Sequence, residues 1–190
     1  MKKRILPALA LALAFTFASC TCKKANNNQT AATTQTADSA NAAANGHEDN
    51  TNAPQYADFS LPSLDGKMVK LSEVVAKNKI TMIDFWASWC GPCRGEMPNV
   101  VEAYKKFHGK GLEIVGVSLD ERKEDWADAV KEMGMTWIQL SDLKGWECSA
   151  ARLYHVQGIP ACLLINQKGE IVGNDLRGEE LHNRLAELLK

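Results

Sequence analysis

The chain has 190 residues, enough for one domain of ordinary size with extensions. Its composition, 45% hydrophobic and 24% charged, is that of a globular protein, and 22 basic against 23 acidic residues give a formal net charge of −1. A balanced charge without a concentrated basic surface argues against nucleic acid as a partner.

The first 19 residues have the pattern of a secretory signal peptide. Three basic residues, Lys2 to Arg4, precede an apolar, alanine-rich run from Ile5 to Phe17. This run is too short to cross a bilayer comfortably, because a spanning helix needs about 20 residues, and it ends in small residues. We therefore expect residues 1–19 to be a signal peptide that is removed on export.

The end of the signal carries a candidate lipidation site. The residues Phe17-Ala18-Ser19-Cys20 resemble a bacterial lipobox, with Phe17 in place of the usual Leu. The resemblance implies that Cys20 is lipidated and that its acyl chains anchor the mature protein to a membrane. Ordinary cleavage nearby, with Cys20 unmodified, is the alternative.

A polar segment follows the candidate lipid site. Residues 21–55 contain no Val, Ile, Leu, Met, Phe, Trp or Tyr, and Asn, Ala, Thr and Gln dominate. Such a segment cannot bury enough apolar surface to form a core, so we predict that residues 20–55 form a disordered tether. As a flexible coil it would span about 30 Å.

Residues 56–190 have the composition and periodicity of a globular domain. The predicted elements, in chain order, are a hairpin over 59–71, a short helix over 72–77, a buried strand over 80–87, a helix over 92–108, a strand over 112–119, a helix over 125–133, a strand over 136–140, a helical turn over 149–154, a second hairpin over 161–173 and a closing amphipathic helix over 179–189. Alternation of strand and helix predicts an α/β fold: a parallel core sheet, extended by the antiparallel strands of the second hairpin, with helices on both faces.

The motif Cys90-Gly91-Pro92-Cys93 lies where the buried strand becomes a helix. A helix N-terminus carries unpaired N–H groups and a partial positive charge, which stabilise a thiolate and lower the pKa of Cys90. Cys93 lies about one helical turn further on, near enough to form a disulfide with Cys90. This context favours a redox-active dithiol. A purely structural disulfide is the alternative, whereas zinc would need a second, similarly spaced pair that the sequence lacks.

The motif and its surroundings resemble a known family. The run Ile83-Asp84-Phe85-Trp86-Ala87-Ser88-Trp89-Cys90-Gly91-Pro92-Cys93 resembles the active-site strand and loop of thioredoxins. Two further runs, Arg94-Gly95-Glu96-Met97-Pro98 and Tyr154-His155-Val156-Gln157-Gly158-Ile159-Pro160, resemble the membrane-anchored TlpA/ResA branch. The resemblance covers about residues 57–190. It implies a thioredoxin fold with a central mixed β-sheet, an N-terminal β-hairpin extension and an insertion before the strand that follows a cis-proline.

The resemblance also implies roles for single residues. Asp84 matches the buried acid behind the dithiol, where desolvation raises its pKa and lets it take the proton of Cys93. Pro160 matches the cis-proline that faces the dithiol, and Ile159 pairs its backbone with the substrate. Glu96 matches an active-site acid of ResA-like proteins, with a solvated helix charge as the alternative.

The surface around the sulfurs is expected to contact the substrate. Trp89, Gly91 and Pro92 are the candidate contacts within the motif itself. In one departure from the family pattern, Ala161 stands where Thr commonly follows the cis-proline. The change removes a hydroxyl group near the sulfurs.

The remaining cysteines and the histidines suggest no cofactor or metal. Cys22 lies in the predicted tether, and Cys162 lies in an apolar strand, as expected for a small buried hydrophobe. A bridge between Cys148 and Cys162 is an open alternative in an oxidising compartment. The four histidines form no ligand cluster in the sequence, and His155 is expected at the surface.

Four functions remain to be compared. The first is a periplasmic reductase of disulfides in exported proteins, recharged by a thiol-reducing electron donor in the membrane, with cytochrome c maturation as one role known in the family. Its Gly-Pro spacer resembles that of thioredoxin, a reductant near about −270 mV. An oxidase or isomerase would use the same residues at a higher potential. A peroxidase of this fold needs Pro and Thr upstream of its cysteine, and this sequence lacks that pattern. Copper carriers of the fold usually space their cysteines one residue wider than Cys90 and Cys93.

Overall fold

The computed structural model describes residues 55–190. The predicted signal peptide, the candidate lipid site at Cys20 and all but the last residue of the predicted tether lie outside the described residues. Within residues 55–190, no helix is both long enough and apolar enough to cross a membrane.

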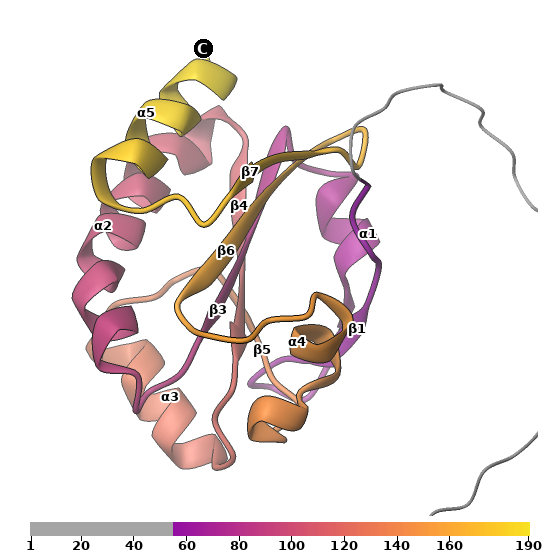
Figure 1. The fold of residues 1–190 in the computed structure, drawn as a ribbon, viewed down its shortest axis with the longest axis vertical. Helices are drawn as coiled ribbons and strands as arrows, with labels where there is room; N and C mark the ends of the chain where they lie inside the picture. The colour runs from indigo at the N-terminus through magenta and orange to yellow at the C-terminus, as the bar shows by residue number, and fades with distance from the viewer. Residues whose placement is uncertain (1–54) are drawn as a thin grey trace, which may run out of the picture. The chain divides into compact units, whose positions relative to one another are not determined.

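Five strands form a mixed sheet in the order β5-β4-β3-β6-β7 (Figure 1). The parallel strands are β3 (Ile80–Trp86), β4 (Leu112–Ser118) and β5 (Ile138–Leu140), whereas β6 (Ala161–Asn166) is antiparallel to both β3 and β7 (Ile171–Asn174). All seven residues of β3 are buried, because this strand lies at the centre of the sheet and helices pack on both of its faces. The predicted parallel core with antiparallel strands on one side is confirmed.

Helices cover both faces of the sheet (Figure 1). On one side lie α2 (Gly91–Phe107), α3 (Lys123–Glu132) and α5 (Gly178–Leu188), and on the other lie the shorter α1 (Leu71–Val75) and α4 (Ser149–Leu153). The long helices bury apolar residues spaced three or four apart, as their sequence pattern predicts.

Two additions extend this core. A hairpin of β1 (Ser60–Pro62) and β2 (Met68–Lys70) precedes α1, with Gly66 in the left-handed conformation (φ 83°) that its turn requires. The segment between β5 and β6 carries a 3₁₀ turn, η2 (Gly145–Glu147), followed by α4. These are the predicted N-terminal hairpin and the predicted insertion. A second 3₁₀ turn, η1 (His108–Lys110), ends α2, and Gly111 (φ 109°) follows it.

Candidate active site

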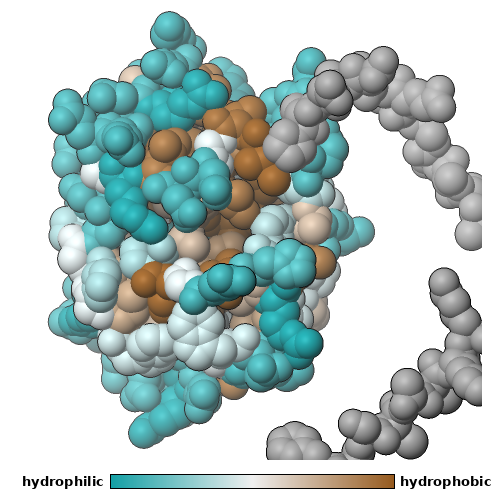
Figure 2. All heavy atoms as spheres, in the orientation of Figure 1, coloured by the Kyte–Doolittle hydropathy of each residue, from teal (hydrophilic) through white to brown (hydrophobic). Residues whose placement is uncertain are grey.

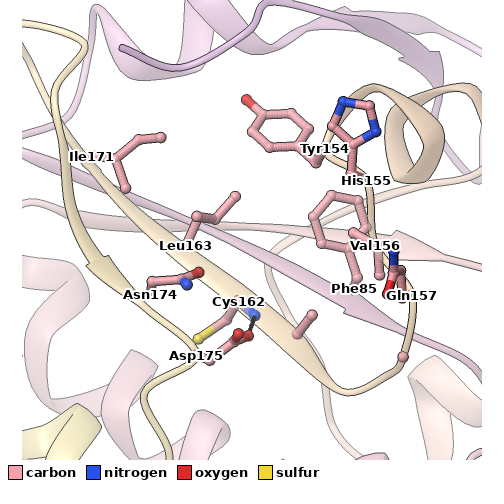
Figure 3. A pocket seen from close by; sticks show the side chains of 12 residues that line it. Phe85, Tyr154, His155, Val156, Gln157, Cys162, Leu163, Ile171, Asn174 and Asp175 are labelled. Carbon is pink, nitrogen blue, oxygen red and sulfur yellow. Dashed lines mark hydrogen bonds between the residues drawn. The ribbon is translucent and has the colours of Figure 1, made fainter. Parts of the chain in front are cut away.

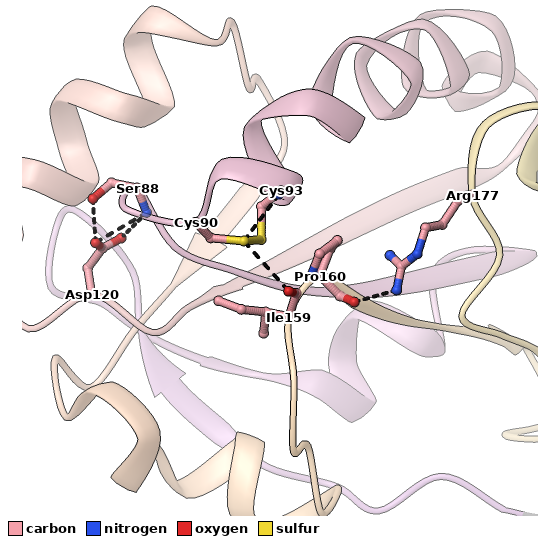
Figure 4. The surroundings of a disulfide bond; sticks show 7 residues. All are labelled: Ser88, Cys90, Cys93, Asp120, Ile159, Pro160 and Arg177. Carbon is pink, nitrogen blue, oxygen red and sulfur yellow. Dashed lines mark hydrogen bonds between the residues drawn. A yellow bond between two sulfur atoms is a disulfide. The ribbon is translucent and has the colours of Figure 1, made fainter.

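The dithiol lies at the N-terminus of α2, where the chain leaves the central strand. Cys90 is the N-cap residue, and its Sγ accepts a hydrogen bond of 3.1 Å from the backbone N–H of Cys93. A disulfide joins the two sulfurs (Figure 4). Both side chains are buried, with 5% of Cys90 and 1% of Cys93 exposed, so Cys90 is the more accessible sulfur. The positive end of the α2 dipole therefore points at the sulfur of Cys90.

A buried carboxylate fixes the loop that leads to Cys90. Asp120 follows β4 and accepts hydrogen bonds from the backbone N–H of Ser88 at 3.1 and 3.2 Å and from its hydroxyl group at 2.6 Å (Figure 4). The Ser118 hydroxyl donates to the same carboxylate at 2.7 Å. Loop 87–90 is thus tied to the neighbouring strand immediately before the reactive sulfur.

The segment before β6 faces the disulfide from the opposite side. The Ile159–Pro160 peptide bond is cis, as the resemblance implies, and the carbonyl oxygen of Ile159 lies 3.7 Å from the Sγ of Cys90. The guanidinium group of Arg177, just before α5, donates a hydrogen bond to the carbonyl oxygen of Pro160 (Figure 4). The sulfurs therefore lie between the first turn of α2 and this anchored segment.

Asp84 lies behind the dithiol on the face of β3 that α2 covers. Its side chain lines a cavity of about 10 Å³ together with Cys93, Glu96 and Pro160. Burial raises the pKa of Asp84 to about 7, while the positive charge of Arg177 acts to lower it and the negative charge of Glu96 to raise it. A cavity of about this size is the least that one water molecule needs, so one water can connect the carboxyl group to Cys93.

Glu96 lies beside the dithiol and also holds two helices together through hydrogen bonds. One carboxylate oxygen accepts a 2.7 Å hydrogen bond from the backbone N–H of Gly178, and the other accepts a bond of 3.1 Å from Asn99. Glu96 thus joins α2 to the N-terminus of α5, where a negative charge is stabilised by the helix dipole. It is half-buried rather than a solvated helix charge.

The predicted substrate-contact residues are accessible around the sulfurs. Trp89 is 56% exposed, and Gly91 and Pro92 are also exposed. Pro92 lines an open hollow of about 450 Å³ with Ile159, Pro160 and Arg177. The structure therefore brings every predicted site residue of the described domain to one edge of the sheet.

Sequence reasoning missed two polar residues of this site. Asp120 carried a usable signal, because it directly follows a predicted strand parallel to β3, and the carboxyl ends of parallel strands meet at one edge of a sheet. Arg177 carried none, since only the tertiary structure brings it to Pro160.

A second hollow, of about 660 Å³, lies on the face of the sheet that α4 covers only in part (Figure 3). Phe85, Tyr154, Val156, Leu163 and Ile171 supply its apolar lining. Figure 2 shows hydrophobic atoms exposed in the middle of the visible surface and surrounded by hydrophilic ones.

The other cysteines of the described domain are buried thiols. Cys148 and Cys162 are 0% and 3% exposed and are not paired with each other, so the alternative of a bridge between them is wrong. Burial is the main reason why the pKa of Cys162 is raised to about 12, and the nearby negative charge of Asp84 adds to the rise. Among residues 55–190, no group of three His, Cys, Asp or Glu side chains is placed to hold a metal ion.

Comparisons with known proteins match this domain. The sequence model of the AhpC/TSA family matches residues 52–173. The thiol-disulfide oxidoreductase ResA of Bacillus thuringiensis subspecies konkukian is 33% identical over 132 residues, which cover 70% of this chain and 73% of that protein.

Solved structures are also similar. The thioredoxin domain of a thiol-disulfide oxidoreductase from Bacteroides vulgatus is 31% identical with a TM-score of 0.67, covering 74% of this chain and 99% of that one. A thiol-disulfide oxidoreductase from Bacteroides fragilis is also 31% identical with a TM-score of 0.67, covering 72% and 100%. The predicted fold is therefore confirmed.

Proposed function

The chain belongs to the AhpC/TSA family and is a thiol–disulfide oxidoreductase of thioredoxin fold, and from this premise we propose that it reduces disulfides in exported proteins. One observation carries the proposal: the more accessible sulfur, Cys90, caps α2 and lies 3.7 Å from the carbonyl oxygen of Ile159. A nucleophilic sulfur and an open backbone acceptor thus lie side by side, where an extended polypeptide can bind with its own disulfide over Cys90.

The first step begins with the reduced dithiol. The Cys90 thiolate, stabilised by the N-terminus of α2 and by the N–H of Cys93, attacks one sulfur of the substrate disulfide. A bond forms between Cys90 and that sulfur, the substrate S–S bond breaks, and the other substrate sulfur leaves as a thiolate that takes up a proton.

In the second step Cys93 attacks the sulfur of Cys90. Asp84, directly or through one water in the shared cavity, takes the proton of the Cys93 thiol. The Cys90–Cys93 bond forms as the bond between Cys90 and the substrate sulfur breaks, and the second substrate sulfur leaves as a thiolate that takes up a proton. Two electrons have passed to the substrate, and the protein is left with the Cys90–Cys93 disulfide that the structure shows.

The cycle requires a source of two electrons and a place to work. We assign the first to a thiol-reducing electron donor in the membrane, and the second to the periplasmic side of the cell envelope. The signal-like residues 1–19, the lipobox-like cysteine at position 20 and the polar segment up to residue 55 support that location. Disulfides in apocytochromes c, or in a partner of their maturation, are one substrate class that the resemblance of residues 57–190 to the TlpA/ResA branch implies.

Single-turnover reduction tests the proposal. The full chain, purified in detergent and reduced beforehand, is mixed with an excess of a peptide disulfide. We expect about one peptide disulfide to be reduced per chain, none with Cys90→Ser, and a trapped mixed disulfide with Cys93→Ser. If the reduced chain left the peptide intact while the oxidised chain rapidly oxidised the peptide dithiol, the direction would be that of an oxidase and the reductase proposal would be wrong.

A further inference from the structure

Two exposed tryptophans lie together beside the reactive sulfur. Trp89, next to Cys90, is 56% exposed, and Trp146 in η2 is 46% exposed. Their ring centroids are 6.3 Å apart, with the planes tilted by 53°. Large aromatic side chains exposed in this way commonly mark a binding surface, because burying them against a partner is favourable.

The topology explains why the two rings meet. Strands β3, β4 and β5 are parallel, so the loops that follow them reach the same edge of the sheet. The first of these loops carries Trp89, the second carries Asp120, and the third leads to η2 and Trp146. The insertion thus adds an aromatic side chain to the edge that already holds the dithiol.

The third loop is fixed by hydrogen bonds. The Ser141 hydroxyl donates to the carbonyl oxygen of Ser118 at 2.9 Å, so the loop is tied to the end of β4. Asp142 accepts from the backbone N–H groups of Lys144 at 3.3 Å and Ser149 at 3.0 Å, one on each side of Trp146. Trp146 is therefore presented from a fixed loop.

The backbone of this loop enters the left-handed region twice just before the tryptophan, and at Leu143 this conformation is unfavourable. Leu143 has a φ of 57° and Gly145 a φ of 56°, both in the left-handed region. A residue with a side chain adopts this region only at an energetic cost, and such costs occur more often at functional sites. In the same loop Cys148 is buried while Trp146 stays exposed.

We infer that Trp146 is a specificity-determining residue, which binds a large apolar side chain of the substrate polypeptide close to its disulfide-bonded cysteine. The inference rests on the proposed function. The partner that binds at Trp146 is the substrate polypeptide whose disulfide Cys90 attacks. The ring of Trp146 lies beside that of Trp89, and Trp89 is next to Cys90 in the chain. An extended chain advances by about 3.3 Å per residue and its side chains alternate between two faces. A side chain two residues from the target cysteine therefore lies on the same face as that cysteine and about 7 Å from it, a spacing close to the 6.3 Å between the rings of Trp89 and Trp146.

The test compares two peptides that differ at one position. Both contain the same disulfide, and one has Phe and the other Ser two residues from the cysteine that Cys90 attacks. Reduction rates are measured with the full chain in detergent, for the wild type, Trp146→Ala and Trp146→Phe. Met68→Ala is the matched control, because Met68 is an exposed apolar residue (64%) on the separate hairpin strand β2.

We expect Trp146→Ala to reduce the Phe peptide about tenfold more slowly, the loss typical of truncating an aromatic anchor, and the Ser peptide at nearly the wild-type rate. Trp146→Phe should retain most of the rate, and Met68→Ala all of it. Reduction of glutathione disulfide and the reduction potential of the dithiol should be unchanged in every variant, since neither depends on a bound polypeptide.

Three outcomes would overturn the inference. Trp146→Ala leaving both peptides unaffected would show that the ring binds nothing. Equal slowing of both peptides, or of glutathione disulfide, would show that Trp146 only supports the loop. A wild-type chain that reduced neither peptide would refute the reductase proposal and this inference together, whereas the first two outcomes refute this inference alone.

Discussion

Replacing Asp84 by Asn should make the protein more stable at alkaline pH although it removes a residue of the active site. The carboxyl group is 4% exposed, and its burial raises the pKa from 3.8 to about 7. Between these two values the folded chain holds a proton that the unfolded chain has released. Stability therefore falls as the pH rises through this window, and the full penalty is present above pH 7.

The size of the penalty follows from the shift. A rise from 3.8 to about 7 is about three pKa units, and each unit corresponds to about 1.4 kcal/mol, which gives about 4 kcal/mol at pH 8. A buried Asn amide with incomplete hydrogen bonding costs about 1–3 kcal/mol. We expect a net gain of about 1–3 kcal/mol at pH 8, with a mutational effect about 3–4 kcal/mol more favourable at pH 8 than at pH 4.

Urea unfolding of the oxidised full chain at pH 4, 6 and 8 measures this difference, with the exposed Asp128→Asn as control. The control should be nearly neutral at every pH. If Asp84→Asn were less stable than the wild type at pH 8, or if its effect were the same at pH 4 and pH 8, Asp84 would not be a carboxyl group destabilised by burial.

Two further substitutions probe residues around the dithiol. Asp120→Asn should lower the free energy of unfolding by about 1–3 kcal/mol, because an amide cannot accept all the hydrogen bonds that Ser88 and Ser118 donate. The exposed Asp125→Asn is the control and should cost less than about 1 kcal/mol. Equal losses for the two variants in urea unfolding would contradict this reasoning. Arg177→Gln removes a positive charge that lowers the pKa of Asp84, so the pKa of Asp84 should rise. Attack of Cys93 on a mixed disulfide at Cys90 should then require a higher pH, because Asp84 accepts a proton only when it is ionised. An unchanged pH–rate profile would argue against Asp84 as the proton acceptor.

Most of the fold was predictable because its signals are local. The apolar run that forms β3, the three- and four-residue spacing in α2 and the Gly66 turn each specify an element without reference to the rest of the chain. Helix and strand bounds shifted by one or two residues, as at α3, which begins at Lys123 rather than Asp125. The 3₁₀ turn at Gly145 was missed, since its sequence has no apolar periodicity.

The site residues that belong to a recognisable sequence motif were predictable. Cys90, Cys93 and Asp84 belong to one continuous segment, so their proximity follows from a strand, a turn and a helix. Arg177 and Trp146 reach the same edge from segments far along the chain. Their positions depend on the register of β6 against β3 and on the course of the insertion, which local sequence does not encode.

The central claim, that this dithiol is a reductant, is tested most directly by the reduction potential of Cys90–Cys93. The full chain in detergent is equilibrated against dithiothreitol or glutathione buffers, the fraction of disulfide is measured by thiol labelling, and Cys90→Ser must abolish the transition. We predict a potential below about −240 mV, towards the thioredoxin end of the scale. A potential near about −120 mV would contradict the reductase proposal and indicate that the protein inserts or exchanges disulfides.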